Sequence, residues 1–128
     1  MGNYIHVNLN PKHKRVGDCV VRAISEALGQ SWHETYIGIC VQGALDGDMP
    51  DGNKVWGHYL TRKGFIRKKI PDSYPPDYDV EDFAMDNPRG TYILAIDGHV
   101  VCIKDGKIYD SWYSGEEHPA YVWHKEGT

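Results

Sequence analysis

The sequence predicts a single domain of the α+β class, in which amphipathic helices come first and an antiparallel β-meander follows. Apolar residues between positions 18 and 64 recur at helical spacing, whereas those after position 90 alternate with a period of two. Asp-Gly pairs at positions 97–98 and 105–106 separate these alternating runs and signal β-hairpin turns. A length of 128 residues suits one hydrophobic core and is short for two, so residues 1–128 are expected to form one domain.

The first helix is predicted to start after Asp18. Residues 1–16 before it are polar with scattered apolar positions, and Asn10-Pro11 indicates a turn or an extended arm. Asp18 is a suitable N-cap, and Gly29 ends the helical run. The apolar face of this helix consists of Val20, Val21, Ala23, Ile24, Ala27 and Leu28.

Two further helices are expected before residue 64. Ser31, followed by Glu34 three positions later, predicts a capping box and a second helix. Asn53 is expected to cap a third, short helix that stops at Gly64. The inward face of the second helix is predicted to consist of Tyr36, Ile37, Cys40, Val41 and Ala44.

The C-terminal half predicts one more helix and most of the strands. Phe65-Ile66, with the basic run after it, indicates a short edge strand, because Lys-rich edges resist pairing with other chains. Residues 71–79 hold three prolines and are expected to be irregular, and Asp79 is expected to start a short helix. Strands are then predicted over residues 91–96, 99–104, 107–112 and 120–124.

Composition and charge exclude several classes of function. The net charge of -4 argues against nucleic acid as a partner, since phosphate binding needs clustered Lys and Arg. No stretch approaches the roughly 18 apolar residues that span a bilayer, and the N-terminus lacks signal-peptide features, so no membrane partner and a cytoplasmic location are expected. Three widely spaced cysteines indicate no disulfide framework, and without a CxxC, HxxxH or HExxH pattern no structural metal site is expected.

Cys19 has unusual surroundings for a free thiol, because it lies just inside the predicted start of the first helix. A helix N-terminus carries partial positive charge and unpaired N–H groups, which favour the thiolate and suit an oxyanion. A small apolar residue buried at a helix start would fit this position as well. Cys40 and Cys102 are expected to be core residues.

The predicted hairpin places a histidine and an aspartate on one face of the sheet. With a two-residue turn at positions 105–106, His99 lies opposite Trp112 and is a diagonal neighbour of Asp110. A hydrogen bond between His99 and Asp110 is then within reach, and Trp112 covers it. A polar pair on an apolar face is costly unless it is used. A nucleophilic Cys, a base and an orienting third group are the parts of acyl-transfer chemistry.

Three features occur in this order along the chain: Cys19, the step Gly98-His99 and the segment Asp110-Ser111-Trp112. In these features and their order the chain resembles the papain-like cysteine peptidases, and most of all their small bacterial and phage members. In that family a Cys opens the central helix, a His opens a strand of the C-terminal sheet, and an Asn or Asp lies on the next strand. The resemblance implies a papain-like fold whose nucleophile helix packs on the meander. It implies a thiol hydrolase of peptide, isopeptide or amide carbonyls in a protein or peptide substrate, without a cofactor. Cys19 would be the nucleophile, His99 the base, Asp110 the orienting group and Trp112 the shield.

The sequence departs from this family at the oxyanion hole. The family carries a Gln six residues before the Cys, and His13 stands at that position here. His13 and Asn10 are therefore the candidate side-chain donors, beside the backbone N–H of Cys19. The Trp that follows the Cys in papain is also replaced, by Val20.

Two alternatives stay open. The segment from Cys19 to Ser25 is also similar to the Cys-x-x-Arg-Ala-Ile segment of ovarian-tumour-type deubiquitinases, which would change the substrate but keep the nucleophile. A rival from another class is a non-catalytic papain-fold binding module, such as a phage inhibitor of a host protein, to which the missing Gln and the small size point. Arg22, one turn after Cys19, is expected to be a structural anchor and not a catalytic residue.

Overall fold

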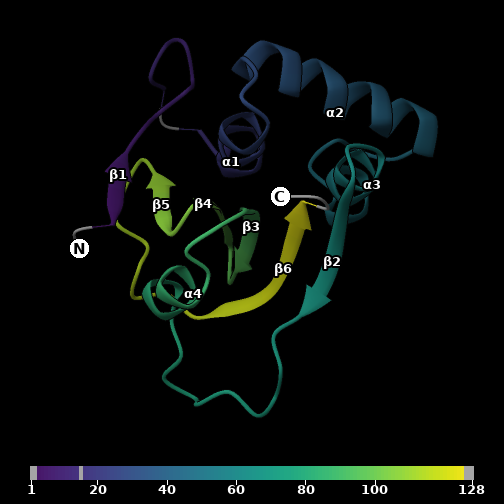
Figure 1. Cartoon of the computed structure of the whole chain (residues 1–128). Helices are drawn as coiled ribbons and strands as arrows, with labels where there is room; N and C mark the ends of the chain where they lie inside the picture. Colours follow the sequence, from purple (N-terminus) through teal and green to yellow (C-terminus); the bar gives the residue numbers. More distant parts are fainter. Residues whose placement is uncertain (1–2, 15, 126–128) are drawn as a thin grey trace.

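The computed structural model describes residues 3–14 and 16–125 and is a mixed α+β fold, as the sequence predicts. Helices and strands in this part of the chain gather around one sheet (Figure 1). The helices are α1 (Cys19–Leu28), α2 (Trp32–Asp46), α3 (Asn53–Arg62) and α4 (Val80–Asp86). The strands are β1 (Tyr4–His6), β2 (Phe65–Lys69), β3 (Thr91–Ile96), β4 (His99–Lys104), β5 (Lys107–Asp110) and β6 (Pro119–Lys125).

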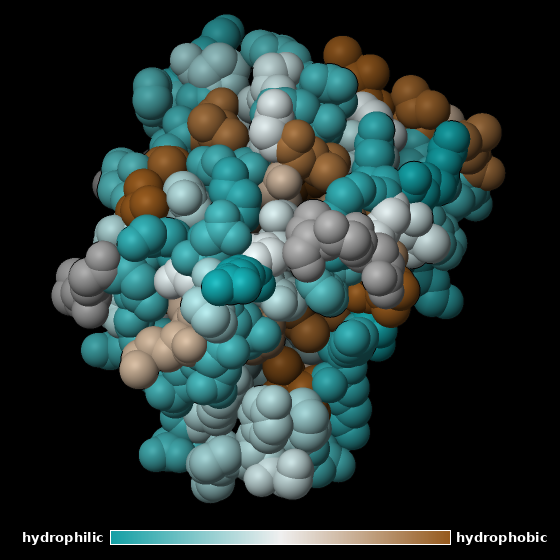
Figure 2. Space-filling view, viewed as in Figure 1, coloured by the Kyte–Doolittle hydropathy of each residue, from teal (hydrophilic) through white to brown (hydrophobic). Residues whose placement is uncertain are grey.

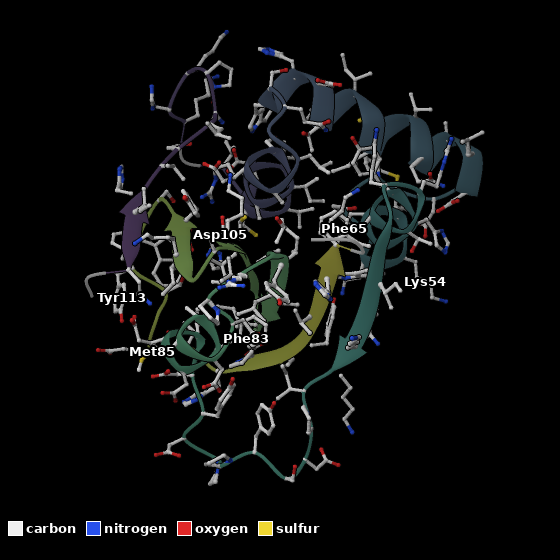
Figure 3. The ribbon with its side chains drawn as sticks, in the orientation of Figure 1. Lys54, Phe65, Phe83, Met85, Asp105 and Tyr113 are labelled. Atoms are coloured by element: carbon white, nitrogen blue, oxygen red, sulfur yellow. The ribbon has the colours of Figure 1, made fainter. Side chains whose placement is uncertain are left out.

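The sheet lies between two layers of helices. Figure 1 shows α1, α2 and α3 on one side of it and α4 on the other. Side chains alternate between these layers along β4: Val100 and Cys102 belong to the core under α1 and α3, whereas Val101 and Ile103 belong to the core under α4. Phe83 is buried and points from α4 toward the sheet, while Met85 of the same helix is exposed (Figure 3).

The order of strands corrects the prediction of a simple antiparallel meander. The order is β1-β5-β4-β3-β6-β2, so β6 returns to the far side of β3 and pairs with the edge strand β2. β1 pairs parallel to β5, and no strand was predicted in this N-terminal part of the chain. A parallel pair has no connecting hairpin, so no local turn residue in the sequence indicates it.

The turn between β4 and β5 follows the prediction. Lys104 pairs with Lys107 across a two-residue turn in which Asp105 and Gly106 have φ angles of 49° and 75°. Positive φ at both central positions is the type I′ geometry, which glycine and aspartate tolerate best. The turn sets the register of the hairpin, and the register decides which face each side chain takes. β5 ends at Asp110, two residues before the predicted end.

The inward face of α2 differs from the prediction. Its buried residues are Thr35, Ile39, Gln42 and Gly43, whereas Tyr36, Ile37 and Val41 are about half exposed, Cys40 is half-buried and Ala44 is exposed. Apolar residues occur on every side of this helix, so spacing could not single out one face. The buried face instead carries side chains with polar partners: the Thr35 hydroxyl accepts a hydrogen bond from Ser25, and Gln42 accepts one from Arg62. An apolar surface remains outside, at the upper right of Figure 2.

Two of the predicted helix caps are confirmed, and a third is corrected. Ser31 Oγ accepts from the Glu34 N–H, and Asp79 with Asp82 completes a capping box at α4, as expected. Gly52 and not Asn53 occupies the N-cap position of α3, because Asn53 lies in the helix and accepts a hydrogen bond from the indole of Trp56. These differences move boundaries by one residue and leave the elements unchanged.

Candidate active site

Cys19, His99 and Asp110 meet at one point of the fold. Cys19 is the first residue of α1, His99 the first of β4 and Asp110 the last of β5. His99 Nε2 lies 2.6 Å from Asp110 Oδ2, which confirms the hydrogen bond predicted from the hairpin register. Cys19 and His99 line the same cleft and lie close enough for each to shift the pKa of the other. Because Nε2 is engaged with Asp110, Nδ1 is the nitrogen left for Cys19.

Cys19 and His99 each shift the pKa of the other toward its charged form. Burial alone would lower the pKa of His99, but the hydrogen bonds and charges of Asp110 and Cys19 outweigh burial and raise this pKa to about 9. Burial would likewise raise the pKa of the Cys19 thiol, whereas His99, the N–H of Val100 and the charge of Arg22 lower it below its ordinary value. Both shifts favour the thiolate–imidazolium form of the pair over the neutral form.

Asp110 is a buried carboxylate with partners on both oxygens. Its side chain is 2% exposed. Oδ2 accepts from His99 and, at 2.7 Å, from the Ser114 hydroxyl; Oδ1 accepts from the Ser111 N–H at 2.7 Å and from Arg22 Nη1 at 3.4 Å. These contacts hold the carboxylate in one rotation, with Oδ2 directed at His99. Ser114 is fully buried and was not found by sequence reasoning, because no pattern marks a serine four residues after Asp110.

Asp18 occupies the N-cap position of α1, as predicted, but its side chain does not cap the helix. Its carboxylate accepts from Arg22 Nε at 2.8 Å, Trp32 Nε1 at 2.9 Å and Asn10 Nδ2 at 3.1 Å. Burial opposes ionisation of Asp18, and these hydrogen bonds outweigh it and lower its pKa. The first N–H groups of α1, including that of Cys19, consequently have no side-chain cap.

The two side chains named as oxyanion donors lie elsewhere. Asn10 is buried and its amide donates to Asp18, while its Oδ1 accepts from the Lys12 N–H. His13 is exposed, at a positive φ of 51°. Neither residue lines the cleft beside Cys19. The structure therefore brings Cys19, His99 and Asp110 together and leaves Asn10 and His13 outside this group.

Trp112 packs against His99 from outside the sheet. The two ring centroids are 4.7 Å apart, with the rings tilted by 40°. Trp112 keeps 44% of its surface exposed, whereas the side chain of His99 is 10% exposed. The contact predicted from the hairpin is confirmed, and the indole covers His99 while its own outer edge stays in solvent.

A cleft of about 940 Å³ opens at Cys19 and His99. One wall comes from α1 and α2, and the other comes from the β3–β4 turn and the start of β6. Aromatic side chains line much of it, namely Trp32, Tyr36, Trp56 and Tyr121. The second free thiol, Cys40, is half-buried and lines the same cleft, while Cys102 is fully buried in the core as expected.

No helix in residues 3–14 and 16–125 is long and apolar enough to cross a membrane. Within the same residues, no group of three or more His, Cys, Asp or Glu side chains is arranged to hold a metal ion. No protein-family model, curated protein or solved structure matches the chain. Function is therefore inferred from the geometry of Cys19, His99 and Asp110.

Proposed function

We propose that the protein is a papain-like cysteine hydrolase that acts on a peptide, isopeptide or amide carbonyl through Cys19, His99 and Asp110. One observation carries the proposal: a half-buried thiol at a helix N-terminus lies in one cleft with a histidine that lowers the thiol pKa, and Nε2 of this histidine lies 2.6 Å from a buried aspartate. The cleft of about 940 Å³ beside this thiol supplies room for a substrate chain.

The geometry supports a two-step acyl transfer. The Cys19 thiolate attacks the carbonyl carbon, and the amine leaves as it takes the proton from the His99 imidazolium, so that a thioester remains. Neutral His99 then accepts a proton from an attacking water, and collapse of the second tetrahedral intermediate releases the carboxylic acid and the thiolate. Asp110 orients His99 throughout.

The oxyanion of each tetrahedral intermediate would lie at the start of α1. The N–H of Cys19 and the N–H groups after it are uncapped, because the Asp18 carboxylate is engaged with three side chains. Backbone donors at a helix N-terminus stabilise a developing negative charge without reorganisation. This arrangement replaces the side-chain donor that was expected from residues 8–13.

The papain-like part of the proposal rests on layout. The nucleophile opens a helix that packs against the sheet, the histidine opens a strand, and the aspartate ends the next strand, in that chain order. A binding module on the same scaffold is the second candidate, and the exposed apolar residues of α2 favour it. These residues are Tyr36, Ile37, Val41 and Leu45.

A peptide-derived vinyl sulfone distinguishes the two candidates. Wild type is expected to be labelled covalently on Cys19, whereas Cys19→Ala and His99→Ala stay unlabelled. Cys40→Ala is the matched control, since it removes the other thiol of the same cleft and should leave the labelling intact. Failure of wild type to react, or labelling of Cys19 no faster than labelling of Cys40, would overturn the hydrolase in favour of the binding module.

A further inference from the structure

Arg22 lies between two buried carboxylates that flank the candidate pair. Its Nε donates to Asp18 Oδ1 at 2.8 Å, and its Nη1 donates to Ser111 Oγ at 2.8 Å and to Asp110 Oδ1 at 3.4 Å. The Arg22 side chain is itself 15% exposed. One guanidinium thus joins Asp18, the N-cap of α1, to Asp110 at the end of β5, which is 88 positions after Arg22 in the chain.

We propose that Arg22 is a positioning residue for the reacting thiol, acting on Cys19 and His99 through the two carboxylates without touching a substrate. The inference rests on the proposed function, because it concerns the same three residues. In this role Arg22 is more than a structural anchor, because it affects the reactivity of the Cys19 thiol separately from any effect on the stability of the fold.

The first argument is geometric. Arg22 and the Ser111 N–H occupy Oδ1 of Asp110, so Oδ2 is left for His99 and Ser114. The planar fork of a guanidinium presents donors in fixed directions and serves Asp18 and Asp110 at once. A lysine ammonium is a single point charge and cannot reproduce both contacts. Without the fork, Oδ1 of Asp110 keeps only the Ser111 N–H, so the carboxylate and His99 are held less firmly in their orientation.

The second argument concerns charge. Asp18 and Asp110 are both nearly inaccessible to water, and both lie close to Cys19 or to its partner His99. A buried carboxylate that has lost its cation repels a nearby thiolate and raises the thiol pKa. Arg22 also acts on the thiol directly, since its positive charge favours the thiolate. Loss of the cation and loss of the fork therefore both decrease the reactive form of Cys19.

The test measures alkylation of Cys19 by iodoacetamide as a function of pH, with the modified peptide quantified by mass spectrometry. In Arg22→Gln the rate at pH 6 is expected to fall about tenfold, which corresponds to a thiol pKa about one unit higher. Arg22→Lys keeps the charge and loses the fork, so an intermediate decrease is expected. Ser111→Ala removes one acceptor of the guanidinium and should shift the profile in the same direction.

Lys104→Met is the matched control. Lys104 Nζ donates to the backbone oxygen of Glu26 at 3.0 Å and to its carboxylate at 2.8 Å, so it anchors the other end of α1 to β4. This variant is expected to lower the melting temperature and to leave the pH profile of Cys19 unchanged. Arg22 variants that lower the melting temperature and keep the wild-type profile would overturn the inference.

The outcomes separate this inference from the proposed function. A wild-type Cys19 that reacts like an ordinary thiol refutes the proposed function, whatever the Arg22 variants do. A wild type that reacts at low pH, with Arg22 variants that match it, refutes only the role of Arg22. If Arg22→Gln fails to fold, Arg22→Lys and Ser111→Ala decide the matter, because each retains a cation beside Asp18 and Asp110.

Discussion

Replacing Asp110 by asparagine tests the centre of the site with a change of only one atom. Both carboxylate oxygens act as acceptors, whereas an asparagine side chain has one acceptor and one NH₂ donor. On the Oδ1 side the amide NH₂ would face the Ser111 N–H and Arg22, which are fixed donors. On the Oδ2 side it would face His99 and the Ser114 hydroxyl, which can both become acceptors. The NH₂ group is therefore expected to turn toward His99.

This orientation reverses the tautomer of His99. Nε2 must then accept a hydrogen bond, so the ring hydrogen moves to Nδ1, the nitrogen left for Cys19. An Nδ1–H cannot take the thiol proton, and the neutral thiol is restored. The substitution is thus expected to disable the pair even though its shape is almost unchanged.

The magnitude follows from the pKa of His99. With a pKa of about 9, His99 is about 99% protonated at pH 7. At its ordinary value of about 6.5, only about a quarter remains protonated. Removing the buried negative charge also leaves Arg22 without its ion pair to this side chain, at a cost on the order of 3 kcal/mol of folding stability.

Three measurements check this prediction. Alkylation of Cys19 by iodoacetamide at pH 6 is expected to slow at least tenfold in Asp110→Asn, because each unit of thiol pKa changes the thiolate fraction tenfold. The ring signals of His99 in an NMR titration should move at a lower pH than in wild type. The midpoint of urea unfolding reports the loss of stability.

Asp46→Asn is the control for an aspartate–histidine pair as such. Asp46 Oδ2 lies 2.7 Å from His58 Nδ1, nearly the distance of the buried pair, but His58 is 57% exposed. Exposed pairs contribute little, so this variant should keep the wild-type stability and reactivity. The reasoning is refuted if Asp110→Asn retains the wild-type alkylation rate at pH 6 and the wild-type titration of His99.

Three other expectations follow from the same contacts. Hydrolysis should be lost as pH rises through about 9, because His99 then loses the proton that the leaving amine needs. The rise of activity on the acid side should occur below the ordinary pKa of a thiol, because the Cys19 pKa is lowered. A pH profile of kcat/KM checks both expectations. Iodoacetamide near pH 6 should modify Cys19 well before Cys102, since burial raises the pKa of the Cys102 thiol; equal rates would contradict this. Gly43→Ala should lower stability by about 1–3 kcal/mol in urea unfolding, because its Cβ would lie 2.9 Å from the backbone oxygen of Asp48, whereas Gly17→Ala meets nothing within 4 Å and should be neutral.

Local signals account for the parts of the fold that the sequence predicted. Gly29, in the left-handed backbone conformation, ends α1, and the capping box of Asp79 and Asp82 starts α4. Asp105-Gly106 forms the turn between β4 and β5. Each of these features depends on hydrogen bonds between residues at most five positions apart. Such bonds depend on the neighbouring residues alone and are therefore readable along the chain. The contact of His99 with Asp110 belongs to the same kind, since one short turn determines the register of the hairpin.

The position of Cys19 on α1 was also readable, because helix start signals are local. That Cys19 meets His99 was an expectation from the order of motifs, since 80 residues separate the two and only the packing of α1 on β4 brings them together. Their catalytic roles stay a prediction until the thiol is tested.

Tertiary structure alone decided the remaining features, because these depend on which groups compete for a partner in space. The Asp18 carboxylate does not cap its own helix but accepts hydrogen bonds from Arg22, Trp32 and Asn10. Asn10, a candidate oxyanion donor in the sequence, therefore has a structural role. The same competition turned α2 so that Gln42 lies inside and apolar residues lie outside. The sequence determined the local elements and the candidate residues through short-range bonds. The long-range assignment of each buried charge and donor needed the folded chain, since a buried polar group takes whichever partner the packing places beside it.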